Sequence, residues 1–427
     1  MTAPLRIAVA GLGTVGGGVV HLLQSRAAEL AERAGRKLDI VMVSARDRKK
    51  RRAAEIAQIP WTDNPLALAA SDADVVVELI GGEDGPARTL IGAALAAGKH
   101  VVTANKALLA HHGAEFAAAA ERAHLSLKFE AAVAGGIPIV KALRESLIAH
   151  GASALRGILN GTCNYILTQM EATGRPFAEV LTEAQRLGFA EADPALDIGG
   201  GDTAHKLALL ASLAFGTKPS LEHMVVEGIA DITPQDIAFA REFGCRIKLL
   251  GIARRTPEGI DQRVQPAMVK LGTPLADVDG AFNAVVVDAG ESGPYFFEGR
   301  GAGQAPTAAS VIADLVDIAR GSFGPTFGLP ADRLKALQPG GSRVSAYYLH
   351  FDVLDVPGVL AEIANRLAES GVSIESMIQR SRAPGEPVAI VMITHECLPA
   401  SVTHALKVIA SSDRVLRAPS MIPMEAG

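Results

Sequence analysis

Short apolar runs alternate with Ala-rich segments of helical period along residues 5–130. The apolar runs are RIAVAGL, LDIVMVSA, ADVVVELI, HVVTAN and LSLKFEAA. Because they are apolar at nearly every position rather than at every second one, we expect strands that are buried on both faces. Strands of this kind, separated by helices, build a parallel sheet of βαβ units. The pattern predicts an α/β domain over residues 1–134.

The pattern changes in the middle of the chain, where we expect a second domain over residues 135–300. It contains in order a strand-like ALRGILNG, a helix-like TCNYILTQME, an Asp- and Gly-rich stretch at 188–202 and a helix from about Thr203 to Phe215. Apolar segments with Pro and Gly punctuation around 260–300 suggest an antiparallel sheet. The segment GRGAGQAPTAASVIADLVDIARG then reads as a Gly loop that leads into one more helix. This mixture predicts an α+β domain.

A Gly- and Pro-rich stretch follows and predicts a linker at 323–344. Beyond it, residues 345–427 show six segments in the order strand, helix, strand, strand, helix, strand. They are SAYYLHFDVL, GVLAEIANRLAESG, VSIESMIQRS, PVAIVMITHE, ASVTHALKVIASS and RVLRAPSMIP. The βαββαβ order is that of a ferredoxin-like unit.

Composition narrows the class of protein. The chain has 427 residues, of which 49% are hydrophobic and 20% charged, and its formal net charge is −5. This balance argues against a general binder of nucleic acid or of anionic membranes. The three cysteines are scattered, which supports neither a disulfide framework nor a zinc site and suits a reducing compartment. With no secretory signal and no apolar stretch near the ~20 residues of a membrane span, we expect a cytoplasmic protein.

The sequence GLGTVG at 11–16 follows the first predicted strand and opens a helix at Thr14 and Val15. Gly11 permits a tight turn, Gly13 lets the backbone approach a pyrophosphate, and Gly16 lets helix and strand pack closely. The helix N-terminus then faces the anion. A purely structural Gly turn is the alternative. We favour a dinucleotide cofactor and a Rossmann fold for the first domain.

The end of the second strand bears on which dinucleotide is used. An NAD site usually carries an acidic residue here, whereas this chain has Arg46 with further basic residues at 48–50. A guanidinium can hold a 2′-phosphate at two points, so we expect NADP(H) to be preferred. Asp47 could restore some use of NAD(H). The alternative is a solvated basic helix start, which we expect at least for Arg51 and Arg52.

Long motifs carry a resemblance to a known family. They are TANKALLA at 103–110, FEAAVAGGIPIVKALRESL at 129–147, GILNGTCNYILTQM at 157–170, GFAEADPALDIGGGDTAHKLALL at 188–210 and GRGAGQAPTA at 299–308. In this order the chain resembles homoserine dehydrogenase over residues 5–325. The resemblance implies reversible NAD(P)H-dependent reduction of L-aspartate 4-semialdehyde to L-homoserine, on the path to threonine and methionine. It also implies that the second domain is catalytic and forms a homodimer, or a homotetramer if the C-terminal domains pair as well.

Asp202 and Lys206 are four residues apart at a predicted helix start, so they share one face. Reduction of an aldehyde needs a hydride on carbon and a proton on oxygen. A charged Lys beside the carbonyl can supply the proton and stabilise a developing alkoxide. The Asp can orient that ammonium or help to bind the substrate's amino group. An isolated pair would be a surface ion pair, but the resemblance puts the family's catalytic Lys at Lys206.

The resemblance assigns further residues. Glu191 corresponds to the family's substrate-binding Glu, for which a substrate ammonium is the natural partner, the alternative being a solvated loop acid. Lys106 corresponds to a second functional Lys near the nicotinamide and the substrate. Thr103 is expected to contact the cofactor, as is Asn105. Gly303 is expected to close over the nicotinamide.

Two further features follow from the resemblance. The segment 301–322 is expected to return to the first domain and complete it. Four residues match the positions where the family holds a monovalent cation, typically sodium: Glu130, Val133, Gly135 and Ile137. Apart from Glu130 the ligands would be backbone carbonyls, and oxygen donors alone suit a hard cation rather than zinc. An empty Gly turn is the alternative.

FDVLDVPGVLAEIANRLAESGVSIESM at 351–377 resembles an ACT domain. Asp355, Pro357 and Gly358 fall in the loop before its first helix, where ACT domains form part of an amino-acid site between paired domains. The resemblance implies feedback control, with L-threonine as the expected effector. A module that serves only for assembly is the alternative.

Two other functions fit these motifs less well. Aspartate-semialdehyde dehydrogenase shares the substrate but needs a catalytic Cys, and no motif beside Cys163 supplies a base for one. A non-catalytic amino-acid sensor built on a retired dehydrogenase should have lost Lys206, Lys106 or Glu191, and all three are present. We expect the adjacent His111 and His112 to contribute surface polarity only.

Overall fold

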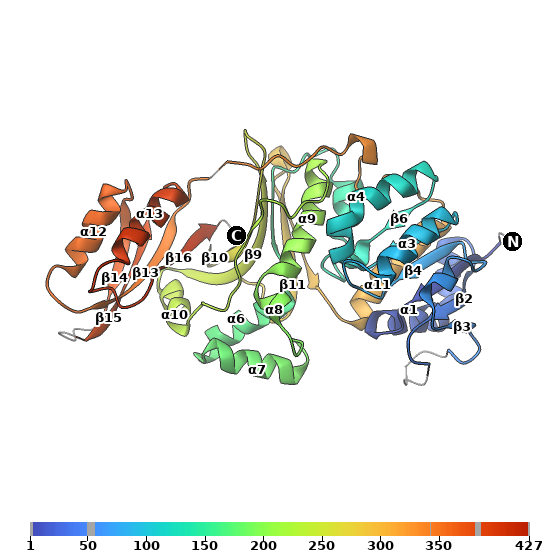
Figure 1. Ribbon diagram of the computed structural model, residues 1–427, viewed down its shortest axis with the longest axis horizontal. Coiled ribbons are helices and arrows are strands. Elements are labelled where there is room, and N and C mark those ends of the chain that lie inside the picture. The colour runs from blue at the N-terminus through green and yellow to red at the C-terminus, as the bar shows by residue number, and fades with distance from the viewer. Residues whose placement is uncertain (1–2, 49–55, 342, 381–385, 426–427) are drawn as a thin grey trace.

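The computed structural model describes residues 3–48, 56–341, 343–380 and 386–425. Figure 1 shows the chain as three lobes in a row, with the N-terminal domain at one end and the C-terminal domain at the other. Within the described residues, no helix is both long enough and apolar enough to cross a lipid bilayer.

The first lobe is built on a six-stranded parallel sheet in the order β3-β2-β1-β4-β5-β6. Its strands are β1 (Leu5–Ala10), β2 (Leu38–Ser44), β3 (Trp61–Thr62), β4 (Val75–Glu78), β5 (His100–Thr103) and β6 (Leu127–Lys128). This is the strand order of a dinucleotide-binding Rossmann sheet, so the predicted fold of this domain is confirmed.

Helices cover both faces of this sheet. They are α1 (Thr14–Ser25), α2 (Ala27–Ala34), α3 (Pro86–Ala96), α4 (Lys106–Arg122) and α11 (Gln304–Ala319). Alternate residues of β1 enter two separate cores: Ala8 packs with α3 and α4, whereas Ile7 packs with α1, α2 and α11. Helix α11 therefore returns from the second lobe to cover the first sheet. It lies so close to α1 that a Cβ on Gly18 would stand 2.7 Å from Cγ of Gln304.

The middle lobe carries a mainly antiparallel sheet with helices on one face. Its strands are β7 (Ala154–Ile158), β8 (Val225–Val226), β9 (Cys245–Arg255), β10 (Ile260–Lys270), β11 (Phe282–Asp288) and β12 (Pro294–Arg300). Its helices are α5 (Ile139–Lys141), α6 (Gly161–Thr173), α7 (Phe177–Leu187), α8 (Ala195–Ile198), α9 (Gly201–Phe215) and α10 (Pro234–Glu242). Helices α6, α9 and α10 pack on β9, and Gly251 of that strand leaves only 3.1 Å between a built Cβ and Cγ2 of Thr203.

The third lobe has the predicted βαββαβ order. Its elements are β13 (Tyr347–Leu354), α12 (Val359–Glu369), β14 (Ile374–Gln379), β15 (Pro387–Thr394), α13 (Pro399–Ile409) and β16 (Ser420–Glu425). Strand β16 pairs in parallel with β10 of the middle lobe, with Met268 opposite Met424. The two sheets thereby join into one ten-stranded sheet, which the sequence pattern did not predict.

Short helical turns complete the structure. They are η1 (Pro65–Leu68), η2 (Glu130–Ala132), η3 (Ala142–Ser146), η4 (Gly290–Ser292) and η5 (Ala331–Arg333). The segment between the second and third lobes runs along the top of the view in Figure 1. Bridges of Lys335 to Thr217 and of Pro339 to Ile260 attach it to the middle lobe.

Candidate active site

The glycine turn lies at the carboxyl end of β1, where parallel sheets bind their ligands. Gly11 has φ +92°, and a Cβ there would stand 2.4 Å from the carbonyl oxygen of Leu79. A Cβ on Gly16 would stand 1.9 Å from the carbonyl oxygen of Gly11. Gly13 caps α1 without a side-chain hydrogen bond, and the space around its Cβ position is open. Gly11 and Gly16 are therefore required by the packing of the turn. At Gly13 the backbone is open to a cavity.

That cavity has a volume of about 630 Å³ and is lined by the glycine turn and by the end of β2. Arg46 lines it together with Asp47 and Asp63. Arg48 is placed differently, with its guanidinium 6.0 Å from the centre of the Trp61 ring. The basic residues 49–52 that accompany Arg46 in the sequence lie outside the described residues. Arg46 is thus the cation of the described basic run that faces the cavity.

The loops after β4 and β5 are held by Glu78, which sequence reasoning did not single out. Its Oε1 accepts hydrogen bonds from the backbone of Ile80 at 2.7 Å and of Gly81 at 3.1 Å, and its Oε2 accepts one from the Thr103 hydroxyl at 2.6 Å. The Asn105 side chain caps α4 by accepting from the Leu108 N–H at 3.1 Å. Thr103 and Asn105, which we expected to contact the cofactor, therefore use their side chains within the protein. They place the next residue, Lys106, at the first position of α4.

A second cavity, of about 710 Å³, lies between the first and middle lobes. Residues of both lobes line it: Thr14, Val15, Lys106, Asn160, Gly161, Thr162, Phe189, Glu191, Asp197, Asp202, Lys206, Asn283, Arg300 and Gly303 are among them. Thr14 and Val15 follow directly on Gly13, which lines the first cavity. The N-terminus of α1 thus borders both cavities, as a dinucleotide that spans them would require.

Asp202 and Lys206 lie in the first turns of α9 and are both buried, with 5% and 9% exposure. Nζ of Lys206 donates to Oδ2 of Asp202 at 2.7 Å, and Nζ of Lys106 lies 3.1 Å from Oδ1 of the same carboxylate. Burial alone would raise the pKa of Asp202, but the two ammonium groups hold it well below its usual range. The structure therefore brings three of the predicted residues together around one carboxylate that stays ionised.

Two further groups at this centre were not predicted. Nζ of Lys206 also donates to the carbonyl oxygen of Leu159 at 2.7 Å. Nδ2 of Asn160 donates to Asp202 Oδ2 at 2.9 Å and to Asp197 Oδ1 at 2.8 Å, while its Oδ1 caps α6. Lys206 therefore uses two of its three N–H groups within the protein and has one left. An Asn directly before a helix was the available signal for Asn160, as an N-cap.

Three other residues line the same cavity. Burial raises the pKa of Asp197. Glu191 is exposed at the rim of the cavity, on the segment between α7 and α8. Gly303 has φ +119°, a backbone conformation suited to glycine, and caps α11.

The predicted cation positions lie on the segment of the chain that passes from the first lobe to the middle lobe. The carboxylate of Glu130 accepts from the backbone N–H of Val140 at 3.0 Å and of Lys141 at 2.8 Å, so it caps α5. Burial raises the pKa of Glu130 to about 7. Ala134 and Gly135 have φ of +51° and +43°. Among the described residues no group of three His, Cys, Asp or Glu side chains is placed to hold a metal ion.

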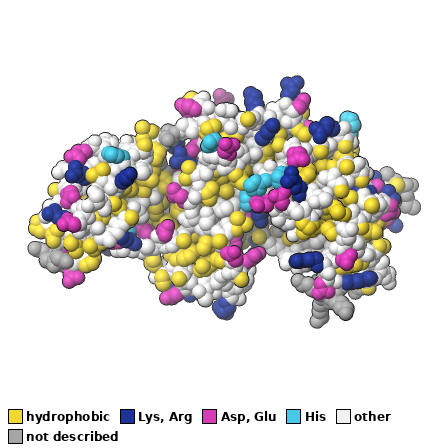
Figure 2. Space-filling model, viewed as in Figure 1, with side chains coloured by type: hydrophobic (Ala, Val, Ile, Leu, Met, Phe, Trp, Pro, Cys, Tyr) yellow, Lys and Arg dark blue, Asp and Glu magenta, His cyan; other side chains and the backbone are white. Residues whose placement is uncertain are grey.

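The structure also places the residues that we set aside. Cys163 is fully buried, its Sγ lies 3.2 Å from the carbonyl oxygen of Asp197, and burial raises its pKa, which disfavours the thiolate that a nucleophile needs. Histidine and acidic side chains gather where the first and middle lobes meet (Figure 2). There the rings of His111 and His205 are 5.7 Å apart, and His111 contacts Glu83.

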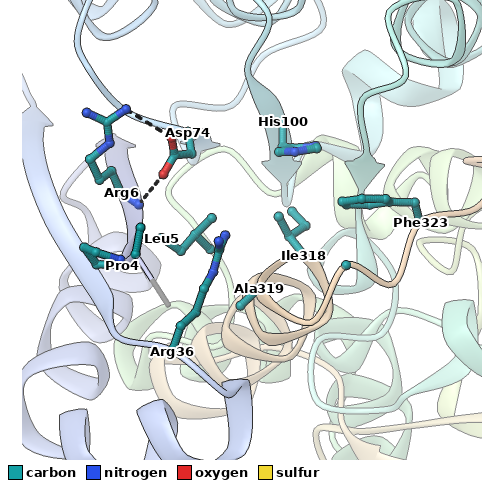
Figure 3. A pocket seen from close by; sticks show the side chains of 11 residues that line it. Pro4, Leu5, Arg6, Arg36, Asp74, His100, Ile318, Ala319 and Phe323 are labelled. Atoms are coloured by element: carbon teal, nitrogen blue, oxygen red, sulfur yellow. Dashed lines mark hydrogen bonds and ion pairs between the residues drawn. The ribbon is translucent and has the colours of Figure 1, made fainter. Parts of the chain in front are cut away.

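Two of the cavities away from this centre belong to the first and the third lobes. One, of about 640 Å³, lies at the amino ends of strands β1 and β5 in the first sheet. Arg36, His100 and Phe323 surround apolar side chains there (Figure 3). The other, of about 380 Å³, is lined by residues 353–360 of the C-terminal domain. It includes Asp355, Pro357 and Gly358, and Gly358 caps α12 with φ +93°.

Comparison with known proteins gives matches along the whole chain. Family models match at residues 11–130 (homoserine dehydrogenase, NAD binding domain), 138–316 (homoserine dehydrogenase) and 347–412 (ACT domain). The chain is 42% identical to homoserine dehydrogenase of Neisseria gonorrhoeae over 99% of both chains, and 42% identical to that of Pseudomonas aeruginosa over 96% of both. The crystal structure of a homoserine dehydrogenase from Thiobacillus denitrificans superposes with a TM-score of 0.93 at 44% identity over 99% of both chains. That of S. aureus homoserine dehydrogenase at pH 7.5 gives 0.77 at 31% identity, also over 99% of both.

Proposed function

The chain belongs to the homoserine dehydrogenase family, and on that premise we propose that it catalyses the reversible NAD(P)H-dependent reduction of L-aspartate 4-semialdehyde to L-homoserine. One observation carries the proposal. Lys206 is held by Asp202 and by the Leu159 carbonyl, so that its remaining N–H is available to a substrate oxygen in the cavity between the lobes.

The residues present fit a dinucleotide. The uncapped N-terminus of α1 and the open space at Gly13 suit a pyrophosphate, and Thr14, Val15 and Gly303 border the side where the nicotinamide would lie. When bound there in its reduced form, the nicotinamide supplies a hydride.

Lys206 does the acid–base work in this proposal. Its ammonium donates a hydrogen bond to the aldehyde oxygen and then a proton, as the carbonyl carbon gains the hydride, so the product is the alcohol. In the reverse direction the neutral amine accepts the proton of the hydroxyl. Asp202 stays ionised, because its pKa is held low, and orients the Lys206 side chain through the hydrogen bond between them.

The two ends of an amino-acid substrate have natural partners in the same cavity. Glu191 and Asp197 are carboxylates that can take the substrate's ammonium group. Gly161 and Thr162 begin helix α6, whose first N–H groups and positive dipole end suit the α-carboxylate. A substrate held at both ends would present its aldehyde to Lys206.

We further propose that Arg46 gives preference for NADP(H), because Arg46 lines the cavity at the end of β2 where its guanidinium could hold the 2′-phosphate. A monovalent cation, with sodium the first candidate, would be bound by Glu130 and by backbone oxygens of Val133, Gly135 and Ile137. The Glu130 carboxylate also accepts the N–H groups of Val140 and Lys141 and keeps further lone pairs for such a ligand.

The ACT domain supports a proposal of regulation by an amino acid, with L-threonine as the effector, at the loop that contains Asp355 and Gly358. The pairing of β16 with β10 supports a route for this regulation, because it joins the ACT sheet directly to the sheet under α9. We also propose a homodimer or homotetramer, a role in threonine and methionine synthesis, and a cytoplasmic location.

The test is reduction of NADP⁺ by the full-length protein with L-homoserine at alkaline pH, repeated with NAD⁺ and then with added L-threonine. Homoserine-dependent reduction establishes the reaction, the ratio of the two cofactors tests Arg46, and inhibition by threonine tests the effector. No reduction with either cofactor, with sodium or potassium present, would contradict the proposed reaction and favour an amino-acid sensor. Threonine without effect would favour an ACT domain that serves for assembly.

A further inference from the structure

Asn283 is the second residue of β11, and its side chain lies beneath the catalytic centre. It is 1% exposed, and it lines the cavity between the lobes. Its Nδ2 donates to the carbonyl oxygen of Leu159 at 3.0 Å. This is the same oxygen that accepts from Nζ of Lys206 at 2.7 Å. One backbone carbonyl therefore binds both side chains.

This shared carbonyl determines where Lys206 points. A carbonyl oxygen has two lone pairs, and here Asn283 occupies one and Lys206 the other. Since the amide also holds the Leu159 carbonyl, the carbonyl cannot turn away from its present direction without losing a buried hydrogen bond. We infer that Asn283 is a positioning residue for the proposed reduction of the aldehyde. It fixes the Leu159 carbonyl and thereby the direction of the one N–H that Lys206 keeps for the substrate. This inference rests on the function proposed above.

The amide is itself held in place by a glycine. A Cβ on Gly301 would stand 2.1 Å from Cγ of Asn283, so the amide lies directly against the Gly301 backbone. Gly301 begins the bend that leads to Gly303 at the start of α11. Asn283 thus connects the proton donor with the segment that borders the proposed nicotinamide position. A substitution at Gly301 or at Asn283 would therefore affect both Lys206 and the segment beside the proposed nicotinamide position.

The carbonyl half of the Asn283 amide argues against a purely structural role for this side chain. Oδ1 of Asn283 is buried and has no hydrogen-bond partner among the described residues. A buried unpaired acceptor is destabilising, and an apolar side chain of similar shape would avoid it. The apolar residue could not hold the Leu159 carbonyl. The N–H group of Asn283 is therefore the feature that justifies an amide at this position.

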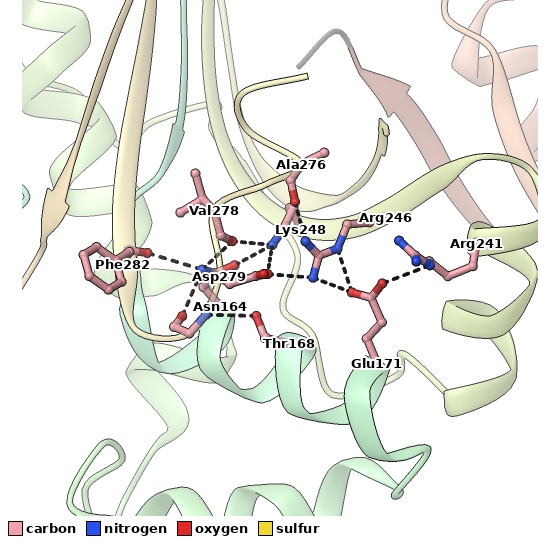
Figure 4. Close-up of polar contacts among 11 residues, drawn as sticks. Asn164, Thr168, Glu171, Arg241, Arg246, Lys248, Ala276, Val278, Asp279 and Phe282 are labelled. Atoms are coloured by element: carbon pink, nitrogen blue, oxygen red, sulfur yellow. Dashed lines mark hydrogen bonds and ion pairs between the residues drawn. The ribbon is translucent and has the colours of Figure 1, made fainter. Parts of the chain in front are cut away.

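A second buried asparagine provides a matched control. Asn164 of α6 is also 1% exposed, and its Nδ2 donates to the carbonyl oxygens of Val278, Gly280 and Phe282. Figure 4 shows how it fastens the loop before β11 together with Lys248, whose Nζ lies 2.5 Å from the Val278 oxygen. The carbonyls that it holds are not the one that binds Lys206. The same substitution at Asn164 therefore perturbs a similar clamp and removes no hydrogen bond of the Leu159 carbonyl.

The experiment compares Asn283→Asp with Asn164→Asp in the full-length protein. An aspartate at 283 removes the N–H and places a carboxylate that competes for the Lys206 ammonium. We expect kcat for homoserine oxidation to fall at least about tenfold with KM for homoserine within about twofold, because an interaction of the chemical step is lost. The deuterium isotope effect with L-homoserine deuterated at carbon 4 should rise. Asn164→Asp should keep kcat within about twofold and lower the melting temperature instead.

Two kinetic results would overturn the inference. One is Asn283→Asp with the kcat and isotope effect of a wild-type protein that oxidises homoserine, which would leave the proposed function standing. The other is an equal fall of kcat in both variants, which would assign the effect to the loop. Asn283→Ala, which adds no charge, should act in the same direction as Asn283→Asp. Crystal structures of the variants are independent of turnover: Lys206 should leave Leu159 in Asn283→Asp, and an unchanged contact would refute the positioning role.

Discussion

Nζ of Lys106 lies 3.1 Å from Oδ1 of Asp202, although the two residues belong to different domains. Lys106 begins α4 of the nucleotide domain, and Asp202 lies in the first turn of α9 in the catalytic domain. The other oxygen of the same carboxylate binds Lys206. A movement of one domain relative to the other would therefore directly affect Lys206, the proposed proton donor. The carboxylate is one of the points at which cofactor domain and catalytic domain meet.

Lys206→Ala should lower kcat by about 10²-fold or more, since positioned proton transfer contributes about 10²–10⁴-fold. Folding and NADPH binding should persist, because the glycine turn and Arg46 are not altered. Steady-state kinetics and fluorescence titration with NADPH measure the two effects. Lys218→Ala, which removes an exposed lysine after the same helix, is the control. Near-normal turnover of Lys206→Ala would disprove its assigned role.

Arg46→Ala should raise KM for NADP(H) by about 10- to 100-fold and leave KM for NAD(H) nearly unchanged, because hydrogen bonds to a charged group contribute about 1.5–3 kcal/mol. The measurement is the ratio of kcat/KM for the two cofactors. Arg48→Ala is the matched control, since Arg48 lies over Trp61 rather than in the cavity. An equal loss with both cofactors would mean that Arg46 does not bind the 2′-phosphate.

Local patterns explain why part of the site could be predicted. The spacing of Asp202 and Lys206 on one helix face and the order of glycines at 11–16 are local features, and each produces its geometry through a single element. The residues that were missed act across the chain. Asn160 meets Asp202 at a separation of 42 residues, and Asn283 meets Leu159 at a separation of 124. Local sequence patterns do not predict contacts between residues so far apart in the chain.

The same reason applies to the fold. The Rossmann sheet and the βαββαβ domain follow from runs of apolar residues, and both are confirmed. Strand β9 was not predicted, and neither was the junction of β16 with β10. That junction depends on edge backbone groups of two distant strands, which carry no side-chain signature. Thr103 illustrates a similar limit: the family resemblance predicts that it contacts the cofactor through backbone or side chain, and the sequence did not indicate that the Glu78 carboxylate engages its hydroxyl.

Gly358→Ala should reduce the response to the amino-acid effector and leave basal activity intact. Gly358 has φ +93° at the start of α12, so a side chain there costs about 1–2 kcal/mol and distorts the loop that lines the ACT cavity. Gly371→Ala at the other end of the same helix is the control, with φ +73° and open space around its Cβ position. The measurement is the inhibition curve for L-threonine. Equal curves for both variants would argue against an effector site at this loop.

Lys248 should make the stability of the protein rise at alkaline pH. Burial lowers its pKa from 10.5 to about 8, so between these values the unfolded chain binds more protons than the native state. Stability therefore increases as pH rises through this window, by up to about 3 kcal/mol. Urea unfolding of the wild type and of Lys248→Met at pH 7.5, 9 and 10.5 tests this. The wild type should gain stability relative to the variant, and a constant difference would contradict a depressed pKa.

Asp236→Ala should loosen the ACT domain from the catalytic domain. The carboxylate of Asp236 is 2% exposed, caps α10 through Thr233, and lies 3.1 Å from the Tyr348 hydroxyl and 2.6 Å from Nδ1 of His350 in β13. Removing it leaves buried polar partners unsatisfied, and loss of one member of such a pair costs about 3–5 kcal/mol. We therefore expect a lower urea midpoint and faster proteolysis of residues 323–344, measured beside Asp231→Ala, an exposed acid just before the same helix. Because β16 pairs with β10, the variant should also weaken the response to the effector while the Asp202–Lys206 contact stays in place. Unchanged stability together with an unchanged response would show that the domains are held by the paired strands alone.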